Sequence, residues 1–225
     1  MSRVELPVEV EPLDRALLDG VRSSPRAKPG EGERVRLDLG LVPVFSEERP
    51  LLGLAGLMDW RGCGRLSALF RSGFGSASFG EQLLLPCDRR LPVARLVLVG
   101  LGPRAAFDDA RTSEIAQRLV GIARGLRAKS VLLALPSAGI ERNRTEALFA
   151  AFLGALQDAD EISVGSDAKG DADGSKRDTG GAGRGSTTPA PASRWWIAVD
   201  EAVVARLRRV LAGPPRAARG TGLHT

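Results

Sequence analysis

The strongest constraint on the fold is a nearly continuous apolar run at residues 93–99, VARLVLV. Runs of this kind are typical of strands buried on both faces of a parallel sheet. A helix is predicted next, capped by Asp108 or Asp109, with apolar residues at helical spacing: Ile115, Leu119, Ile122 and Leu126. A second buried strand at 131–135 and a second helix, started by Asn143 in a capping-box-like pattern, follow. This alternation predicts right-handed crossovers and a parallel or mixed sheet flanked by helices.

Shorter elements precede this pattern. Apolar residues of period two at 35–41, continued by 42–45, predict a strand, and residues 82–85 predict another that ends at Pro86. Two short helices are expected at 51–58 and 65–70, on either side of a Gly-Cys-Gly break. Residues 1–33 are expected to form an N-terminal extension with room for one short strand around residues 4–10.

The composition changes twice towards the end of the chain. Residues 165–193 consist mostly of small and polar residues, which bury too little apolar surface to order themselves, so a disordered insertion is predicted there. A strand at 195–199 follows, in which one of Trp195 and Trp196 should be core and the other a partial cover or contact surface. A helix then runs to residue 212. We therefore expect one domain made of residues 34–164 and 194–212, and a basic flexible tail at 213–225.

The net charge of +5 does not indicate a basic face over the whole fold. Residues 204–225 hold five arginines and no acid, whereas the other 203 residues hold 27 basic and 27 acidic side chains. Nucleic-acid binding would therefore depend on one terminal segment. Its candidate residues are Arg206, Arg208, Arg209, Arg216 and Arg219. The arginines of the last helix are equally explained by the favourable interaction of cations with a helix C-terminus.

Catalytic chemistry has little support in these residues. The only histidine, His224, is the penultimate residue, where a base cannot be held in hydrogen-bonding geometry. Cys63 and Cys87 are too few for a disulfide framework and too far apart for a zinc site. Cys63 is either a thiol activated by Arg61 and Arg65 or, as we prefer, a small residue in a tight corner. We expect no catalytic residue, no metal and no cofactor.

Two glycine-rich stretches are the candidate ligand loops. Residues 100–105 (GLGPRA) match the GxGxxA pattern of dinucleotide sites, but Pro103 stiffens the turn and two carboxylates open the next helix, which favours a structural turn. Residues 72–80 (SGFGSASFG) could cradle a phosphate but lack the Lys-Ser/Thr ending of a P-loop. The candidate ligand-binding residues are Gly73, Gly75, Gly80, Gly100 and Gly102.

The sequence gives no sign of a membrane or secretory protein. Its first residues carry charges and no apolar core of a signal peptide. No apolar stretch approaches the roughly 20 residues that a spanning helix needs. A cytoplasmic location without membrane contact is therefore expected.

Three stretches together resemble the N-terminal domain of the leucyl aminopeptidases, the cytosolic peptidase M17 family. They are residues 64–70 (GRLSALF), 79–86 (FGEQLLLP) and 95–102 (RLVLVGLG), within a resemblance that runs over 57–156. In that family a hydrophobic strand ends in a VGLG-type turn and leads to a helix with an acidic start. The resemblance implies an α/β fold like that of a macro domain, a three-layer mixed sheet flanked by helices.

The resemblance does not bring the family's peptidase chemistry with it. The family's metal-binding lysine, acids and Asn-Thr-Asp-Ala-Glu-Gly-Arg signature belong to a separate catalytic domain, and nothing like that signature occurs here. We therefore expect a non-catalytic binding or assembly module that self-associates or joins a peptidase-like partner, as the resemblance implies. Two alternatives stay open: a macro-like binder of ADP-ribose or a related nucleotide at the glycine loops, and nucleic-acid binding through the arginine-rich C-terminal segment.

Overall fold

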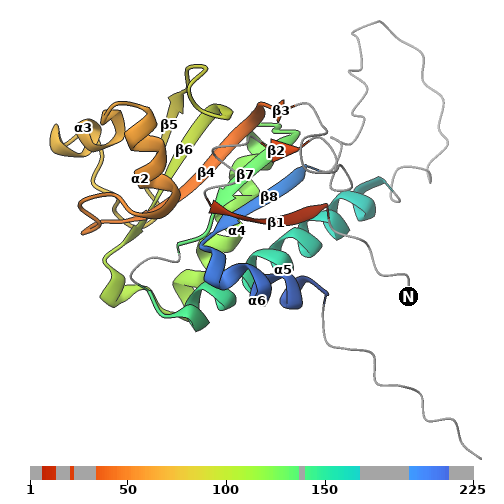
Figure 1. The fold of residues 1–225 in the computed structure, drawn as a ribbon. Coiled ribbons are helices and arrows are strands. Elements are labelled where there is room, and N and C mark those ends of the chain that lie inside the picture. Colours follow the sequence, from red (N-terminus) through yellow and green to blue (C-terminus); the bar gives the residue numbers. More distant parts are fainter. Residues whose placement is uncertain (1–6, 14–20, 23–33, 137–139, 168–192, 213–225) are drawn as a thin grey trace, which may run out of the picture.

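A six-stranded mixed sheet forms the central layer of the computed structural model, which describes residues 7–13, 21–22, 34–136, 140–167 and 193–212. The spatial order of the strands is β1 (Val8–Pro12), β8 (Arg194–Val199), β7 (Ser130–Ala134), β4 (Leu37–Phe45), β6 (Val93–Gly102) and β5 (Gln82–Pro86) (Figure 1). All neighbouring strands are parallel except β5, which is antiparallel to β6. Two short strands, β2 (Val21–Arg22) and β3 (Arg34–Val35), form a separate antiparallel pair.

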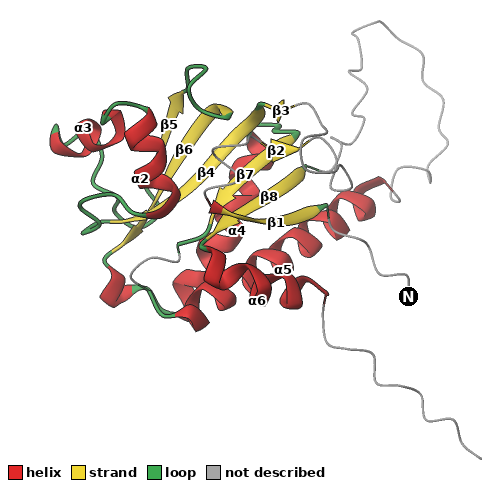
Figure 2. Cartoon of the chain, viewed as in Figure 1, coloured by secondary structure: helices red, strands yellow, loops and turns green. Residues whose placement is uncertain are grey.

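Helices cover both faces of the sheet (Figure 2). One face carries α4 (Asp109–Gly125), α5 (Arg142–Asp167) and α6 (Glu201–Ala212), and the other carries α2 (Gly53–Arg61) and α3 (Arg65–Arg71). A 3₁₀ turn, η1 (Arg104–Ala106), connects β6 to α4. The predicted α/β architecture of a mixed sheet between two helical layers is therefore confirmed. In the ranges that the structure describes, no helix is both long enough and apolar enough to cross a bilayer.

Each face of the sheet supports its own hydrophobic core. Residues of β4 alternate between the two, with Leu39 and Leu41 packed against the three-helix layer and Val42 and Val44 against the two-helix layer. This explains the near-continuous apolar runs of the sequence, because a central strand covered on both sides has no solvent face. The start of α4 is also as predicted: Asp108 is its N-cap, and the carboxylate accepts a hydrogen bond from the Arg111 N–H at 2.9 Å.

The structure differs from the sequence-based expectations in three places. The strand near the N-terminus lies at Val8–Pro12 and pairs with β8, so it is an edge of the main sheet and not part of an extension outside it. Helix α5 begins at Arg142, so Asn143 lies in its first turn and is not its cap, and the helix continues to Asp167, three residues into the segment expected to be disordered. Both Trp195 and Trp196 are buried, one on each face of the sheet, because a hydrophobic core covers each face of β8. Residues 168–192 and the basic tail lie outside the described residues.

Candidate functional site

The two candidate ligand loops lie against each other at the end of β6. The Gly80 N–H donates to the Gly100 carbonyl at 2.8 Å, the Gly100 N–H to the Glu81 carbonyl at 2.8 Å, and the Gly102 N–H to the Ala77 carbonyl at 3.0 Å. An anionic ligand in a glycine loop is held by free backbone N–H groups. Here these three donors are already used by the chain's own backbone.

The glycines of these loops are accounted for by close packing and by backbone geometry. A Cβ atom on Gly100 would lie 2.7 Å from the carbonyl carbon of Ala77 and closer still to the carbonyl oxygen of Ser78. A Cβ on Gly75 would overlap Leu83. Gly73, Gly80 and Gly102 have positive φ angles, of 73°, 80° and 68°, which side-chain-bearing residues rarely adopt.

The tip of the 72–80 loop binds a carboxylate of the protein itself, that of Glu81. The Glu81 carboxylate accepts hydrogen bonds from the Ser76 N–H at 3.0 Å, the Ser76 hydroxyl at 2.8 Å and the Ser78 N–H at 3.2 Å. Partial desolvation acts to raise the pKa of Glu81, but these hydrogen bonds outweigh it and lower the pKa below the ordinary 4.5. The loop can therefore coordinate a carboxylate, and its own side chain does so.

We predict that Glu81→Gln lowers the free energy of unfolding at neutral pH by about 1 kcal/mol, because charge-assisted hydrogen bonds to the loop are lost from a partly exposed site. Since the folded-state pKa of Glu81 lies below its unfolded value, the stabilisation is present above about pH 4.5 and is lost as the pH falls through the folded-state value. Urea denaturation at neutral and acidic pH measures both effects. Glu114→Gln, at an exposed carboxylate, is the control, and an equal loss for Glu81→Gln at both pH values contradicts the prediction.

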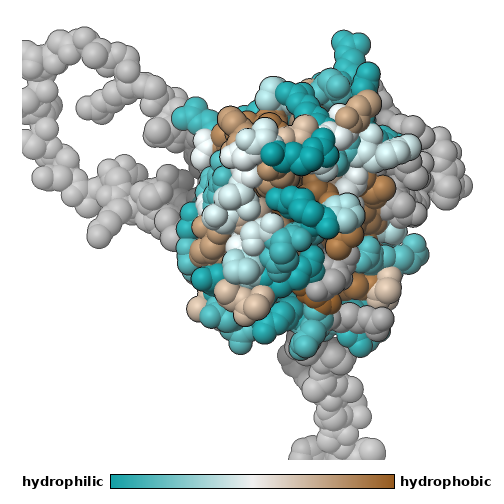
Figure 3. All heavy atoms as spheres, turned by 90° about the vertical axis from the view of Figure 1, so that its left-hand side faces the viewer, coloured by the Kyte–Doolittle hydropathy of each residue, from teal (hydrophilic) through white to brown (hydrophobic). Residues whose placement is uncertain are grey.

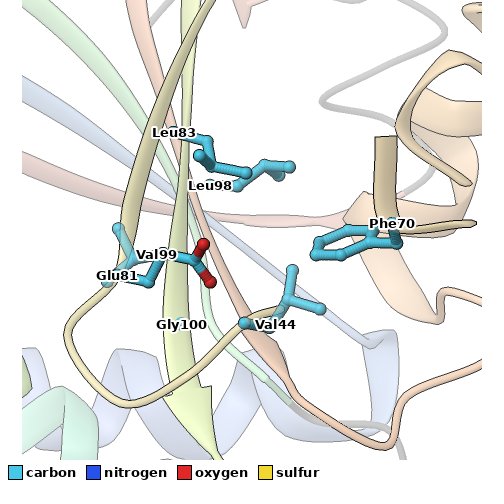
Figure 4. Close-up of a pocket in the computed structure, with 8 residues that line it drawn as sticks. Val44, Phe70, Glu81, Leu83, Leu98, Val99 and Gly100 are labelled. Carbon is cyan, nitrogen blue, oxygen red and sulfur yellow. The ribbon is translucent and has the colours of Figure 1, made fainter. Parts of the chain in front are cut away.

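A shallow hollow beside these loops is too small for a nucleotide. Its volume is about 170 Å³ including open solvent, whereas ligand sites usually occupy about 300–1,000 Å³. Figure 4 shows the side chains of Val44, Phe70, Leu83 and Leu98 around it, with the carboxylate of Glu81 pointing in among them. An apolar lining with one carboxylate does not suit a diphosphate.

The carboxyl ends of β4 and β6, where parallel α/β proteins commonly bind ligands, are joined by an ion cluster. Arg104 donates its backbone N–H to Glu47 at 2.7 Å and its guanidinium to Glu48 at 2.9 Å. The second oxygen of Glu48 accepts from the Leu52 N–H at 3.0 Å. Burial raises the pKa of Glu48 despite its partners, but both of its oxygens are engaged. The cluster therefore ties the loops after β4 and β6 together.

Two of the five candidate nucleic-acid residues make contacts within the fold. The Arg206 guanidinium pairs with Glu146 at 2.9 Å, and the Arg208 guanidinium donates to the Val10 carbonyl of β1 at 2.9 Å. Arg209 is exposed, whereas Arg216 and Arg219 lie outside the described residues. Because both tryptophans of β8 are buried, neither is placed to stack on a base.

The two cysteines do not belong to a metal-binding cluster in the part of the chain that the structure describes. Cys63 is exposed, with a guanidinium nitrogen of Arg90 at 3.2 Å from its sulfur. Cys87 is half-buried, and burial raises the pKa of its thiol. Within the described ranges, no group of three or more His, Cys, Asp or Glu side chains comes together.

Sequence reasoning missed a set of exposed apolar side chains at one end of the molecule. Figure 1 places α2, α3 and β5 together at this end, and Figure 3 shows it face on, with hydrophobic side chains among hydrophilic ones. We call this set the exposed apolar end: Leu52 and Leu57 (38% exposed each), Trp60 (77%), Phe74 (64%) and Leu84 (54%). A signal was present, because Leu57 and Trp60 are three residues apart on a helix whose core face is Leu54 and Met58.

Comparisons with known proteins agree with this geometry at the level of fold. The macro domain of ganglioside induced differentiation associated protein 2 superposes with a TM-score of 0.55 at 9% identity, covering 91% of this chain and 82% of that one. A Trypanosoma brucei macrodomain in complex with ADP gives 0.53 at 13% identity, covering 80% and 65%. The fold is therefore that of a macrodomain-like α/β protein.

Sequence comparison gives the family. The model of the cytosol aminopeptidase family, N-terminal domain, matches residues 41–162, more than half of the chain. A probable cytosol aminopeptidase of Pseudomonas syringae pv. tomato is 28% identical over 122 residues, which are 54% of this chain and 25% of that protein. The chain thus belongs to the cytosol aminopeptidase family through its N-terminal domain, and it spans about a quarter of the curated relative's length. The match does not include a catalytic domain.

Proposed function

We propose that this chain is a non-catalytic assembly module that associates with copies of itself or with a peptidase-like protein. The observation that carries the proposal is the exposed apolar end. Soluble monomers expose single apolar side chains freely, but a tryptophan that is 77% exposed, with an exposed leucine, Leu57, one helical turn away, is typical of a contact surface. Assembly also agrees with the state of the glycine loops, whose backbone N–H groups bond to the chain's own carbonyls and offer few free donors to a small ligand.

The proposal is tested by measuring molar mass with light scattering, for the chain alone and with a cytosol aminopeptidase of the same family added. A molar mass above that of the monomer, for the chain alone or for the chain with the aminopeptidase, supports the proposal. Monomers in both, together with heat released on titration with ADP-ribose, would replace it by nucleotide binding, since one structural neighbour was solved with ADP. A DNA complex whose affinity falls steeply with salt would instead favour nucleic-acid binding.

We predict that Trp60→Glu weakens binding of the peptidase-like partner tenfold or more. Replacing a tryptophan that is buried in an interface often costs about 2 kcal/mol or more of binding free energy. Titration calorimetry with the added aminopeptidase measures the change. Ala205→Glu, at an exposed position of α6 in the opposite helical layer, is the matched control and should bind as the unmodified chain does. Equal binding by both variants would remove Trp60 from the interface.

A further inference from the structure

The outer edge of β5 has no strand beside it in the described part of the chain. The sheet ends at this strand, since β6 is its one neighbour among the strands that the structure describes. Exposed sheet edges tend to pair with other chains unless charges, prolines or bulges block them. From Gln82 to Pro86 the strand has no charged residue, and Pro86 at its end is the one blocking feature.

The hydrogen-bonding pattern shows which groups face outward. The Cys87 N–H donates to the Ala94 carbonyl at 3.0 Å, and the Gly100 N–H donates to the Glu81 carbonyl at 2.8 Å. Because hydrogen-bonded and non-hydrogen-bonded positions alternate in an antiparallel pair, residues 81, 83, 85 and 87 face β6. The N–H and C=O groups of Leu84 and Gln82 therefore point away from the sheet.

Apolar side chains lie on both faces of this edge. Leu84 pairs with Val97, which belongs to the core under α4, α5 and α6, so its side chain lies on that face and is 54% exposed. The opposite face carries Leu83 and Leu85, and Leu83, which is half-buried, lies against the backbone of Gly75. An edge that is apolar on both faces has side chains as well as backbone groups to offer a partner.

We infer that a second copy of this chain pairs with β5 edge to edge, in antiparallel orientation about a two-fold axis at Leu84; this inference rests on the proposed assembly function. The edge is self-complementary. The Leu84 N–H of each copy donates to the Leu84 carbonyl of the other, and the Gln82 N–H of each copy donates to the opposite Pro86 carbonyl. Because proline has no N–H, the return hydrogen bond to the Gln82 carbonyl is missing on each side. No charge meets a like charge between these residues. The two sheets become one continuous sheet, with the Leu84 side chains in contact across the axis.

The pairing predicts a weak dimer, because a five-residue strand buries less surface than a standard interface. Analytical ultracentrifugation over about a hundredfold range of concentration should show a monomer–dimer equilibrium. Leu84→Lys places two ammonium groups at the axis and should raise the dissociation constant at least about tenfold. Leu84→Val keeps an apolar strand former there and should change it little. Circular dichroism verifies that both variants fold.

Site-directed crosslinking locates the axis. In a chain with Cys63→Ser and Cys87→Ser, Leu84→Cys should be joined efficiently by a short bismaleimide, since facing Cβ atoms of an antiparallel pair lie about 5.5 Å apart. Trp60→Cys, on α2, is the matched control and should not be joined. A dimer that forms equally well with Leu84→Lys, or that is linked at Trp60 and not at Leu84, overturns the inference while leaving the proposed assembly function intact. A monomer at every concentration also overturns it, and the proposed function is then decided by the added aminopeptidase.

Discussion

Replacement of Trp195 by alanine is expected to lower the free energy of unfolding by about 3–5 kcal/mol, the usual loss when a large buried aromatic side chain is removed. Trp195 is 2% exposed and sits on β8 between β1 and β7. Its ring meets Phe152 of α5 edge to face, with centroids 4.8 Å apart. The change therefore removes core volume where the sheet and the three-helix layer meet. Urea denaturation followed by far-UV circular dichroism measures the loss.

Two comparisons separate this effect from the loss of any tryptophan. Trp60→Ala, at a residue that is 77% exposed, should change the stability of the isolated chain by no more than about 0.5 kcal/mol. A double-mutant cycle with Phe152→Ala should give a coupling of about 0.5–1.5 kcal/mol, the range measured for aromatic pairs. Similar losses at positions 195 and 60 would show that Trp195 is not buried between the sheet and the three-helix layer.

Much of the fold could be predicted from the local pattern of the chain. The sequence runs that form β4, β6 and β7 are apolar on both faces. A central strand between two helical layers produces a continuous apolar run of this kind, because neither of its faces meets solvent. The N-cap of α4 was also readable, because Asp108 precedes a regular helical stripe. These features depend on neighbours in sequence, which is why one sequence suffices to find them.

Features that depend on distant residues were missed. The N-terminal strand joins the sheet beside Trp195–Val199, a pairing across most of the chain that no local pattern records. The burial of the second tryptophan also depends on distant residues: a partial cover was expected on one face of this strand, but β8 has a packed core on both faces. The exposed apolar end was overlooked for a related reason. The sequence of a short apolar helix is the same whether other residues cover one of its faces or both, and only the packing of distant residues decides which.

The glycines show why the candidate site was the hardest part to predict. A glycine required by a ligand and a glycine required by close packing leave the same letter in the sequence. The structure separates the two possibilities only by showing what occupies the space beside each Cα. At Gly100 that space holds the backbone of Ala77 and Ser78, and at Gly75 it holds the side chain of Leu83.

Gly100→Ala is therefore expected to lower the free energy of unfolding by about 3 kcal/mol, because the new methyl group meets rigid backbone atoms in a fully packed strand. Thermal or urea denaturation measures the loss. Gly121→Ala, inside α4 with nothing within 4 Å of the added carbon, is the matched control and should instead stabilise by about 0.5–1 kcal/mol. A Gly100→Ala variant that keeps full stability would mean that the 72–80 loop leaves β6 readily. The strand end would then be open to a ligand, and the packing role assigned to this glycine would be wrong.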